Sequence, residues 1–127
     1  MILIFDRNSM EAELLRGAVT AMGFSARIVE KSDCGQPLGV LAGENLMGFP
    51  GGLNREPEVP VMVLCHLTEG EIDTVLSDLR QSGLGKNVRK AILTPTNRFW
   101  TAAVLAQELE KERIALLSDR GASQTDK

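Results

Sequence analysis

Two stretches of the sequence lie sixty residues apart and follow the same plan, and this repeat limits the folds that the chain can adopt. The apolar run at residues 2–5 predicts a buried strand, and its residues 3–5 correspond to the apolar residues 63–65. Asn8 follows the first run and Thr68 follows the second, each with a Glu three positions later. This spacing is typical of a helix start, because each side chain of the pair can bond to the other residue's backbone N–H group. The sequence therefore predicts two strand–helix units.

A further strand after each helix would complete two βαβ units. Gly23 and Gly83 close the two predicted helices, as glycine does where a helix ends in a left-handed residue. The alternating pattern at residues 26–30 and the apolar residues at 88–94 then predict the second and fourth strands. All βαβ units share these features, so the repeat does not decide whether one half arose by duplication of the other.

The C-terminal part of the sequence predicts one more helix. Thr101 is a suitable N-cap, and an apolar stripe follows at helical spacing over residues 104–116. We expect this helix at residues 102–117. Residues 118–127 are polar and lack apolar periodicity, which predicts a flexible tail. We therefore expect a single domain over residues 1–117.

The connector at residues 31–58 decides between two arrangements of these units. It holds six glycines, which make a long helix costly. Without a crossover helix, the third strand would insert between the first two. The fold would then be α+β, a ferredoxin-like βαβ-βαβ sandwich with helices on one face of an antiparallel sheet and an extra C-terminal helix. A proper helix at residues 36–47 would instead give an α/β, four-stranded, doubly wound flavodoxin-like sheet. The repeat and the broken connector favour the first arrangement.

Composition argues against several classes of partner. The net charge of −3 does not favour nucleic acid, and 4% aromatic residues without tyrosine supply few rings for base stacking. No apolar run approaches the roughly 20 residues of a membrane-spanning helix. Cys34 and Cys65 are too few for a disulfide framework. We therefore expect a cytoplasmic protein that binds neither nucleic acid nor membrane, with no cofactor.

Catalytic and metal chemistry have little support in the residue pattern. Cys65 and His66 are adjacent, and adjacent strand residues point to opposite faces, so the two side chains cannot easily share a metal. No serine stands in a Gly-x-Ser-x-Gly context. Glu11 and Glu71 already have a structural role in helix capping. We expect no metal site, and we favour a binding protein over an enzyme.

The densest run of specific chemistry extends from Lys90 to Trp100, with the sequence KAILTPTNRFW. Pro95 ends the strand, and Asn97 suits the turn that follows. The N–H groups at the start of the last helix could then bind an anion, with Arg98 supplying charge and Trp100 a ring for stacking. The alternative is that Asn97 caps the turn, Trp100 fills the core and Arg98 is solvated. The candidate binding residues are Thr94, Thr96, Asn97, Arg98 and Trp100.

This segment, with the Leu-x-x-Glu-Leu pattern at residues 105–109, resembles the hallmark of a family of small bacterial and archaeal proteins known only as a domain of unknown function. The helix start at residues 71–73 after an apolar strand is similar as well. The likeness covers residues 60–113 and implies no activity. It marks four signature positions: Thr94, Pro95, Asn97 and Trp100.

Two functions are consistent with these patterns. We expect a non-enzymatic binding or regulatory module that acts through a partner or a small ligand. The apolar stripe of the last helix could cover the open face of the sheet or contact another subunit, so a homodimer or another protein partner is a reasonable expectation. The alternative is an enzyme or sensor that binds a small anionic metabolite at the N-terminus of the last helix.

Overall fold

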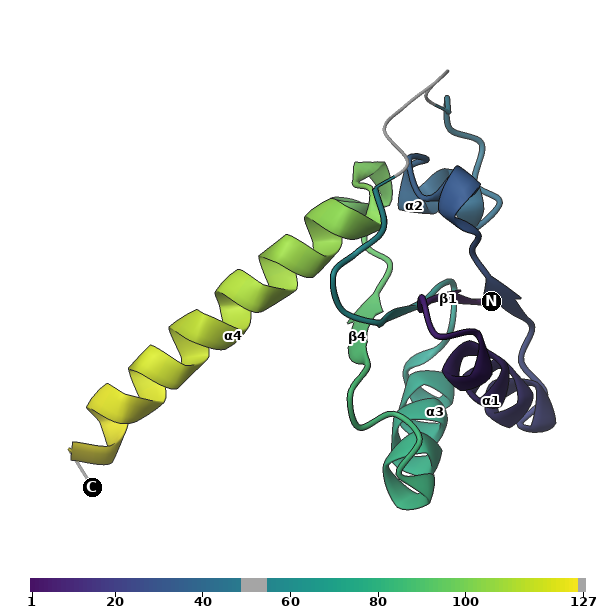
Figure 1. Ribbon diagram of the computed structural model, residues 1–127. Coiled ribbons are helices and arrows are strands. Elements are labelled where there is room, and N and C mark those ends of the chain that lie inside the picture. The colour runs from purple at the N-terminus through teal and green to yellow at the C-terminus, as the bar shows by residue number, and fades with distance from the viewer. Residues whose placement is uncertain (49–54, 126–127) are drawn as a thin grey trace.

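The computed structural model describes the backbone of residues 1–48 and 55–125, with side chains up to residue 115 (Figure 1). The predicted strand–helix order is present in both halves. Two short 3₁₀ turns, η1 and η2, precede α2 and α4. In chain order the elements are β1 (Ile2–Phe5), α1 (Ser9–Ala21), β2 (Ala26–Ile28), η1 (Lys31–Asp33), α2 (Leu38–Leu41), β3 (Val61–Leu64), α3 (Glu69–Ser82), β4 (Arg89–Ile92), η2 (Asn97–Phe99) and α4 (Ala102–Thr125).

The four strands form one mixed sheet in the order β2-β1-β3-β4. β1 is parallel to β2 and β3 is parallel to β4, whereas the central pair β1–β3 is antiparallel. The α+β class is therefore confirmed, and the sheet with its helices is compatible with a ferredoxin-like type of fold. The flavodoxin-like alternative is wrong, because it requires a parallel central pair.

The position of β3 differs from the prediction. β3 does not insert between the first two strands, because β1 and β2 bond to each other directly. The Ile2 N–H donates to the Ser25 carbonyl and the Val29 N–H donates to the Ile4 carbonyl, both at 2.9 Å. β3 instead pairs with the other side of β1, which makes the sheet mixed and not antiparallel.

The central strand pair relates the two halves by a pseudo-two-fold axis. Leu3 faces Val63, and these two residues are sixty positions apart. The neighbouring pairs exchange under the same shift of sixty. They are Ile2 with Leu64, and Ile4 with Met62. The repeat seen in the sequence therefore corresponds to two similar halves packed edge to edge.

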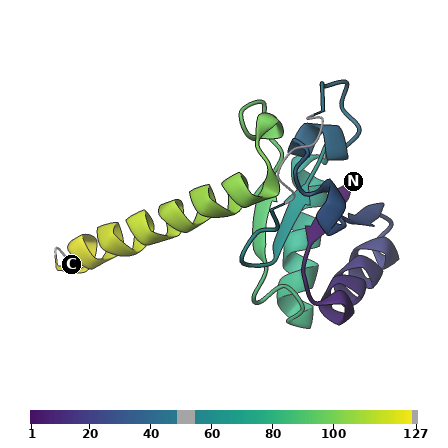
Figure 2. The same cartoon turned by 45° about the horizontal axis from the view of Figure 1, so that its top comes forward.

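Each face of the sheet carries its own core, and helices cover both faces: two helices lie on one, as predicted, and the last helix helps to cover the other, which was one of its two predicted roles. α1 and α3 cover the first face (Figure 2). The second face is covered by α2 and the first turns of α4, because the chain returns over it after β2 and again after β4. The side chains of β1 and β3 are buried on both faces: Ile2, Ile4, Met62 and Leu64 on the first, Leu3, Phe5, Val61 and Val63 on the second.

The predicted helix signals are present as hydrogen bonds with one exception: Glu11 does not reach back to Asn8, because the Asn8 N–H donates to Asp6 Oδ1 at 2.9 Å. The Asn8 side chain accepts from the backbone N–H groups of Met10 and Glu11 at the start of α1. Thr68 and Glu71 form a complete capping box on α3. α3 ends at Gly83, whose φ of 76° places it in the left-handed region that glycine adopts without strain.

α4 is longer than predicted and projects from the body of the molecule (Figures 1 and 2). It continues to Thr125, although the sequence predicted a flexible tail from residue 118. Helical hydrogen bonds join residues four positions apart, so the end of the apolar stripe does not by itself mark the end of the helix. No helix within the described residues is long and apolar enough to cross a bilayer.

Candidate functional site

The predicted site residues lie at the edge of the sheet where β3 and β4 end. Thr94 and Thr96 are exposed in the turn after β4, and Asn97 begins η2. Asp6 follows β1, which runs antiparallel to β3, so Asp6 lies at the opposite edge. Asp6 and Asn97 therefore lie at opposite ends of the strands and cannot belong to one site.

Asn97 is buried, with an exposed fraction of 7%, and its side chain bonds to the backbone on both sides of the turn. Its Oδ1 accepts the Thr94 N–H at 2.8 Å, and its Nδ2 donates to the Ile92 carbonyl at 2.9 Å. The Asn97 N–H in turn donates to Thr94 Oγ1 at 3.0 Å. These bonds give Asn97 the structural role that the sequence offered as an alternative, and they engage both its Oδ1 and its Nδ2 within the turn.

Trp100 joins the turn to the second face of the sheet. Its partly buried ring packs against the core under α2 and α4. Its carbonyl accepts the Leu38 N–H, the first of α2, at 2.8 Å. Trp100 therefore fixes η2 against α2, and the stacking role of its ring stays a prediction.

Arg98 is the predicted residue whose polar groups are least used. Its guanidinium carbon lies 4.8 Å from the centroid of the Phe99 ring, a cation–π contact. Its Nε is buried without a hydrogen-bond partner among the described residues. Phe99 is 52% exposed. The turn therefore presents one cation and one aromatic ring at its surface.

The structure places a further pair beside this turn that the sequence did not reveal. His66 Nε2 lies 2.8 Å from Glu44 Oε2, and His66 has a φ of 59°, in the left-handed region. A Cβ on Gly39 would lie 2.6 Å from Glu44 Oε1 and 3.1 Å from the Arg98 carbonyl oxygen, so glycine lets these groups approach each other. The contact between residues 44 and 66 depends on how α2 and the connector fold. No local pattern in the sequence could therefore have indicated it.

Neither cysteine is suited to be a nucleophile. Burial raises the pKa of the Cys65 thiol to about 11, and the thiol lies 3.6 Å from the Val63 carbonyl. Burial also raises the pKa of the Cys34 thiol, and the nearby Glu56 raises it further. A nucleophile must be a thiolate near neutral pH, which both thiols resist. In the part of the chain that the structure describes, no three His, Cys, Asp or Glu side chains are grouped as metal ligands.

The N-terminus of α4, the predicted anion site, lies directly after this turn. Thr101 Oγ1 accepts the Val104 N–H at 3.4 Å and so takes one of the free N–H groups of the first turn. Ala102 is completely buried. The anionic-ligand hypothesis stays a prediction, with Arg98 as its nearest cation in the sequence.

Residues 60–116 match the model of a family described as a domain of unknown function (DUF3783). The match covers β3, α3, β4, η2 and the first part of α4, which is the second of the two pseudo-symmetric halves. It supports the resemblance to a family of unknown function and assigns no role to individual residues. Comparison with curated proteins and with solved structures gave no match.

Proposed function

We propose that this protein is a non-catalytic binding module that works as a homodimer, with α4 as its contact element. The observation that carries the proposal is the course of α4. Its 24 residues correspond to a length of about 36 Å, and it leaves the body beside β4 (Figure 1). A helix that projects in this way offers a surface that a second chain can cover.

Among the α4 side chains that the structure describes, up to residue 115, those of the first part pack on the rest of the molecule. Leu105 and Ala106 are buried against the second sheet face. An ion pair between Arg89 and Glu110, at 3.6 Å, joins α4 to β4 one turn later. Residues 111–115 are exposed. The helix therefore leaves the body of the molecule over residues 111–115, well before its last residue.

Local interactions alone give this exposed part little stability. Lys111 pairs with Glu108 at 3.1 Å and Arg113 pairs with Glu110 at 2.6 Å, and such pairs contribute about 0.2–0.5 kcal/mol each. Isolated helices of about 12–15 residues are marginal in water even with good helix formers. A covering surface would supply the stability that these pairs do not.

A second copy of the chain fits the charge of this part of α4. Lys111 and Arg113 alternate with Glu110 and Glu112, so two antiparallel copies can meet without net repulsion. The apolar stripe also continues in the sequence, because Leu116 comes eleven residues, or three turns, after the buried Leu105. We therefore propose antiparallel packing of α4 against α4.

Two substitutions on opposite sides of α4 test the proposal. Leu116→Asp places a charge on the proposed contact face. Ile114→Asp is the matched control, because Ile114 comes nine residues after Leu105, on the opposite side, and is 53% exposed. Losing two symmetry-related buried leucines should raise the dimer dissociation constant at least about 100-fold.

Light scattering coupled to gel filtration measures the outcome from micromolar to submillimolar concentration. The unmodified chain and Ile114→Asp should approach twice the chain mass of 13.8 kDa, and Leu116→Asp should remain at that mass. A monomer at every concentration would remove the homodimer. Equal loss in both variants would show that the α4 contact is not made through the Leu116 face.

A further inference from the structure

The two pseudo-symmetric halves differ in length at one point. Ile2 of β1 faces Ala26 of β2, which is 24 positions later, whereas Val61 of β3 faces Arg89 of β4, which is 28 positions later. α1 and α3 start and end at nearly equivalent positions, so the four additional residues lie in the connection between α3 and β4. The first half makes the same βαβ unit without them. The fold therefore does not require this longer connection.

The connection lines a pocket at the C-terminal end of α3. The pocket has a volume of about 540 Å³. Arg80, Lys86 and Lys90 are its charged lining residues, and all three are basic. Leu76 and Leu79 supply an apolar wall. A pocket of this size with a few converging polar groups is typical of small-ligand sites.

Lys90 is held in place by the connection itself. Its Nζ donates to the Gly85 carbonyl at 2.7 Å and lies 3.4 Å from the Val88 carbonyl. A Cβ on Gly85 would lie 2.8 Å from Lys90 Cε, so the end of the Lys90 side chain passes close over Gly85. The ammonium group has three donors, and two carbonyls account for two of them. The connection thus fixes a lysine that keeps one donor.

The positive charge in this pocket is not neutralised by ion pairs within the described residues. Burial lowers the pKa of Lys90, and the charge of Arg80 lowers it further. These two cations are therefore close enough to repel each other in a protein whose net charge is −3. Arg80 also lies in the last turn of α3, where a cation interacts favourably with the helix dipole. This role accounts for one of the three positive charges.

We propose that this pocket binds the phosphate group of a small phosphomonoester. Arg80, Lys86 and the remaining donor of Lys90 would contact the phosphate oxygens, since charge-assisted hydrogen bonds to phosphate are strong. The wall of Leu76 and Leu79 would lie against the organic part. Nucleic acid is not the favoured source of the phosphate, because the chain is acidic overall, with a net charge of −3.

Backbone amide NMR tests the proposal with three probes. Phenyl phosphate should shift the amide resonances of residues 83–90 in a saturable manner. Inorganic phosphate should shift the same resonances more weakly, and phenol should leave them unchanged if the phosphate is the recognised group. Absence of saturable shifts up to about 10 mM phenyl phosphate would overturn the proposal, because specific ligands of this kind bind at millimolar concentration or below. Shifts with phenol alone would also overturn it.

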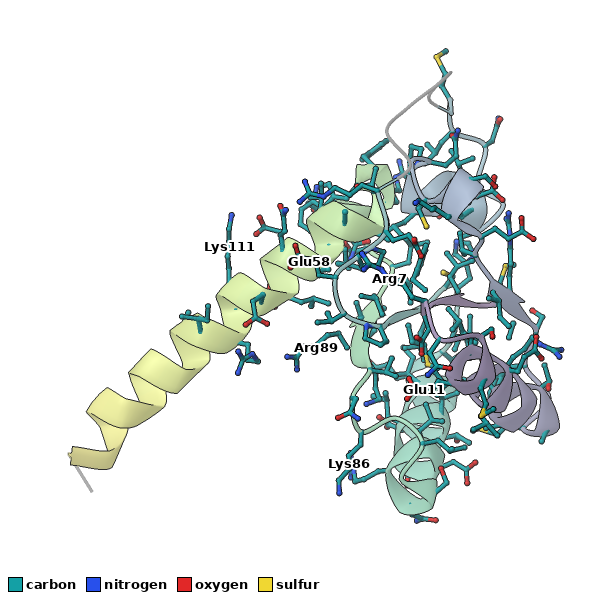
Figure 3. All side chains as sticks on the ribbon, viewed as in Figure 1. Arg7, Glu11, Glu58, Lys86, Arg89 and Lys111 are labelled. Atoms are coloured by element: carbon teal, nitrogen blue, oxygen red, sulfur yellow. The ribbon has the colours of Figure 1, made fainter. Side chains whose placement is uncertain are left out.

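Charge-removing variants show whether the named residues make the contact. Lys86→Gln and Arg80→Gln leave the Lys90 bonds in place, and each should weaken phenyl phosphate binding at least about tenfold. Lys111→Gln is the matched control, because Lys111 lies on α4 away from Lys86 (Figure 3). Equal weakening by all three variants would indicate attraction to overall charge and would contradict a specific pocket. Unchanged binding in both Lys86→Gln and Arg80→Gln would contradict it as well.

Discussion

At the scale of single residues, the buried side-chain amide of Asn97 holds the turn that ends β4. Its Oδ1 and Nδ2 bond to backbone groups of Thr94 and Ile92, on both sides of the strand end. Removing the side chain leaves a backbone N–H and a carbonyl without these partners. An unsatisfied buried polar group costs roughly 1–3 kcal/mol.

We predict that Asn97→Ala lowers the free energy of unfolding by about 2 kcal/mol. Urea unfolding followed by Trp100 fluorescence and by circular dichroism measures the change. Thr96→Ala is the control in the same turn, because Thr96 is exposed. A loss of less than about 0.5 kcal/mol for Asn97→Ala, the size expected of surface changes, would show that water replaces these bonds easily.

The local roles of single residues could be predicted where the chemistry is local. Asn97 was foreseen as a turn residue, because its side chain bonds to groups within five positions. The pair of His66 and Glu44 could not be foreseen, since 22 positions separate the two residues and the packing of the connector decides their distance. The φ of 59° at His66 was equally hidden, because the left-handed region is occupied most often by glycine.

At the scale of the element, the start of α3 is defined by a capping box that also responds to pH. The backbone N–H of Thr68 bonds to the Glu71 carboxylate at 2.8 Å, and this bond, followed by the Thr68 side chain, lowers the pKa of Glu71 below its ordinary value of 4.5. A carboxylate whose pKa is lower in the folded state stabilises that state above its unfolded pKa. This stabilisation is lost as the pH falls through the folded pKa.

We predict that Glu71→Gln is less stable than the unmodified chain at pH 7, and that the difference shrinks as the pH falls below 4.5. The glutamine keeps an acceptor for the Thr68 N–H but cannot ionise, so the comparison isolates the charge. Urea midpoints of both proteins from pH 3 to pH 7 measure it. Parallel midpoints over the whole range would contradict the assignment.

The ends of two helices show which features the sequence could predict and which it could not. The start of α3 was predicted correctly, because capping residues act within one turn of the helix. The end of α4 was misplaced, because the apolar stripe was used to place it at residue 117 and the helix reaches Thr125. Apolar periodicity reports the packing of a helix face, whereas helical hydrogen bonds form without it.

At the scale of the whole molecule, the sequence predicted the class of the fold but not the order of its strands. Both βαβ units were visible, because their signals are local. β3 can pair with β1 either between β1 and β2 or on the other side of β1. The outcome depends on which edge of β1 is free to form hydrogen bonds. The bonds that pair β1 with β2 occupy one edge, so β3 takes the other. Local signals are the same in both arrangements, so the sequence could not distinguish them.

The strands are buried whereas part of α4 is exposed, and this difference leads to a prediction for hydrogen exchange. The central strands β1 and β3 are buried on both faces, so their amides should be the slowest to exchange. Within α4, residues 102–110 pack on the body and serve as an internal control for residues 111–125, which follow the last ion pair to β4. In the monomer at low concentration, we expect residues 111–125 to exchange fast.

Raising the protein concentration should then slow exchange in residues 111–125 and leave residues 102–110 nearly unchanged. Association through α4 adds its free energy to the opening of this segment alone, and each 1.4 kcal/mol slows exchange about tenfold. Mass spectrometry of peptic peptides below and above the dimer midpoint measures the change, and Leu116→Asp should abolish it. If both segments slow together, the second copy contacts the body of the molecule and not α4. If dimers form and neither segment slows, the contact lies elsewhere on the surface.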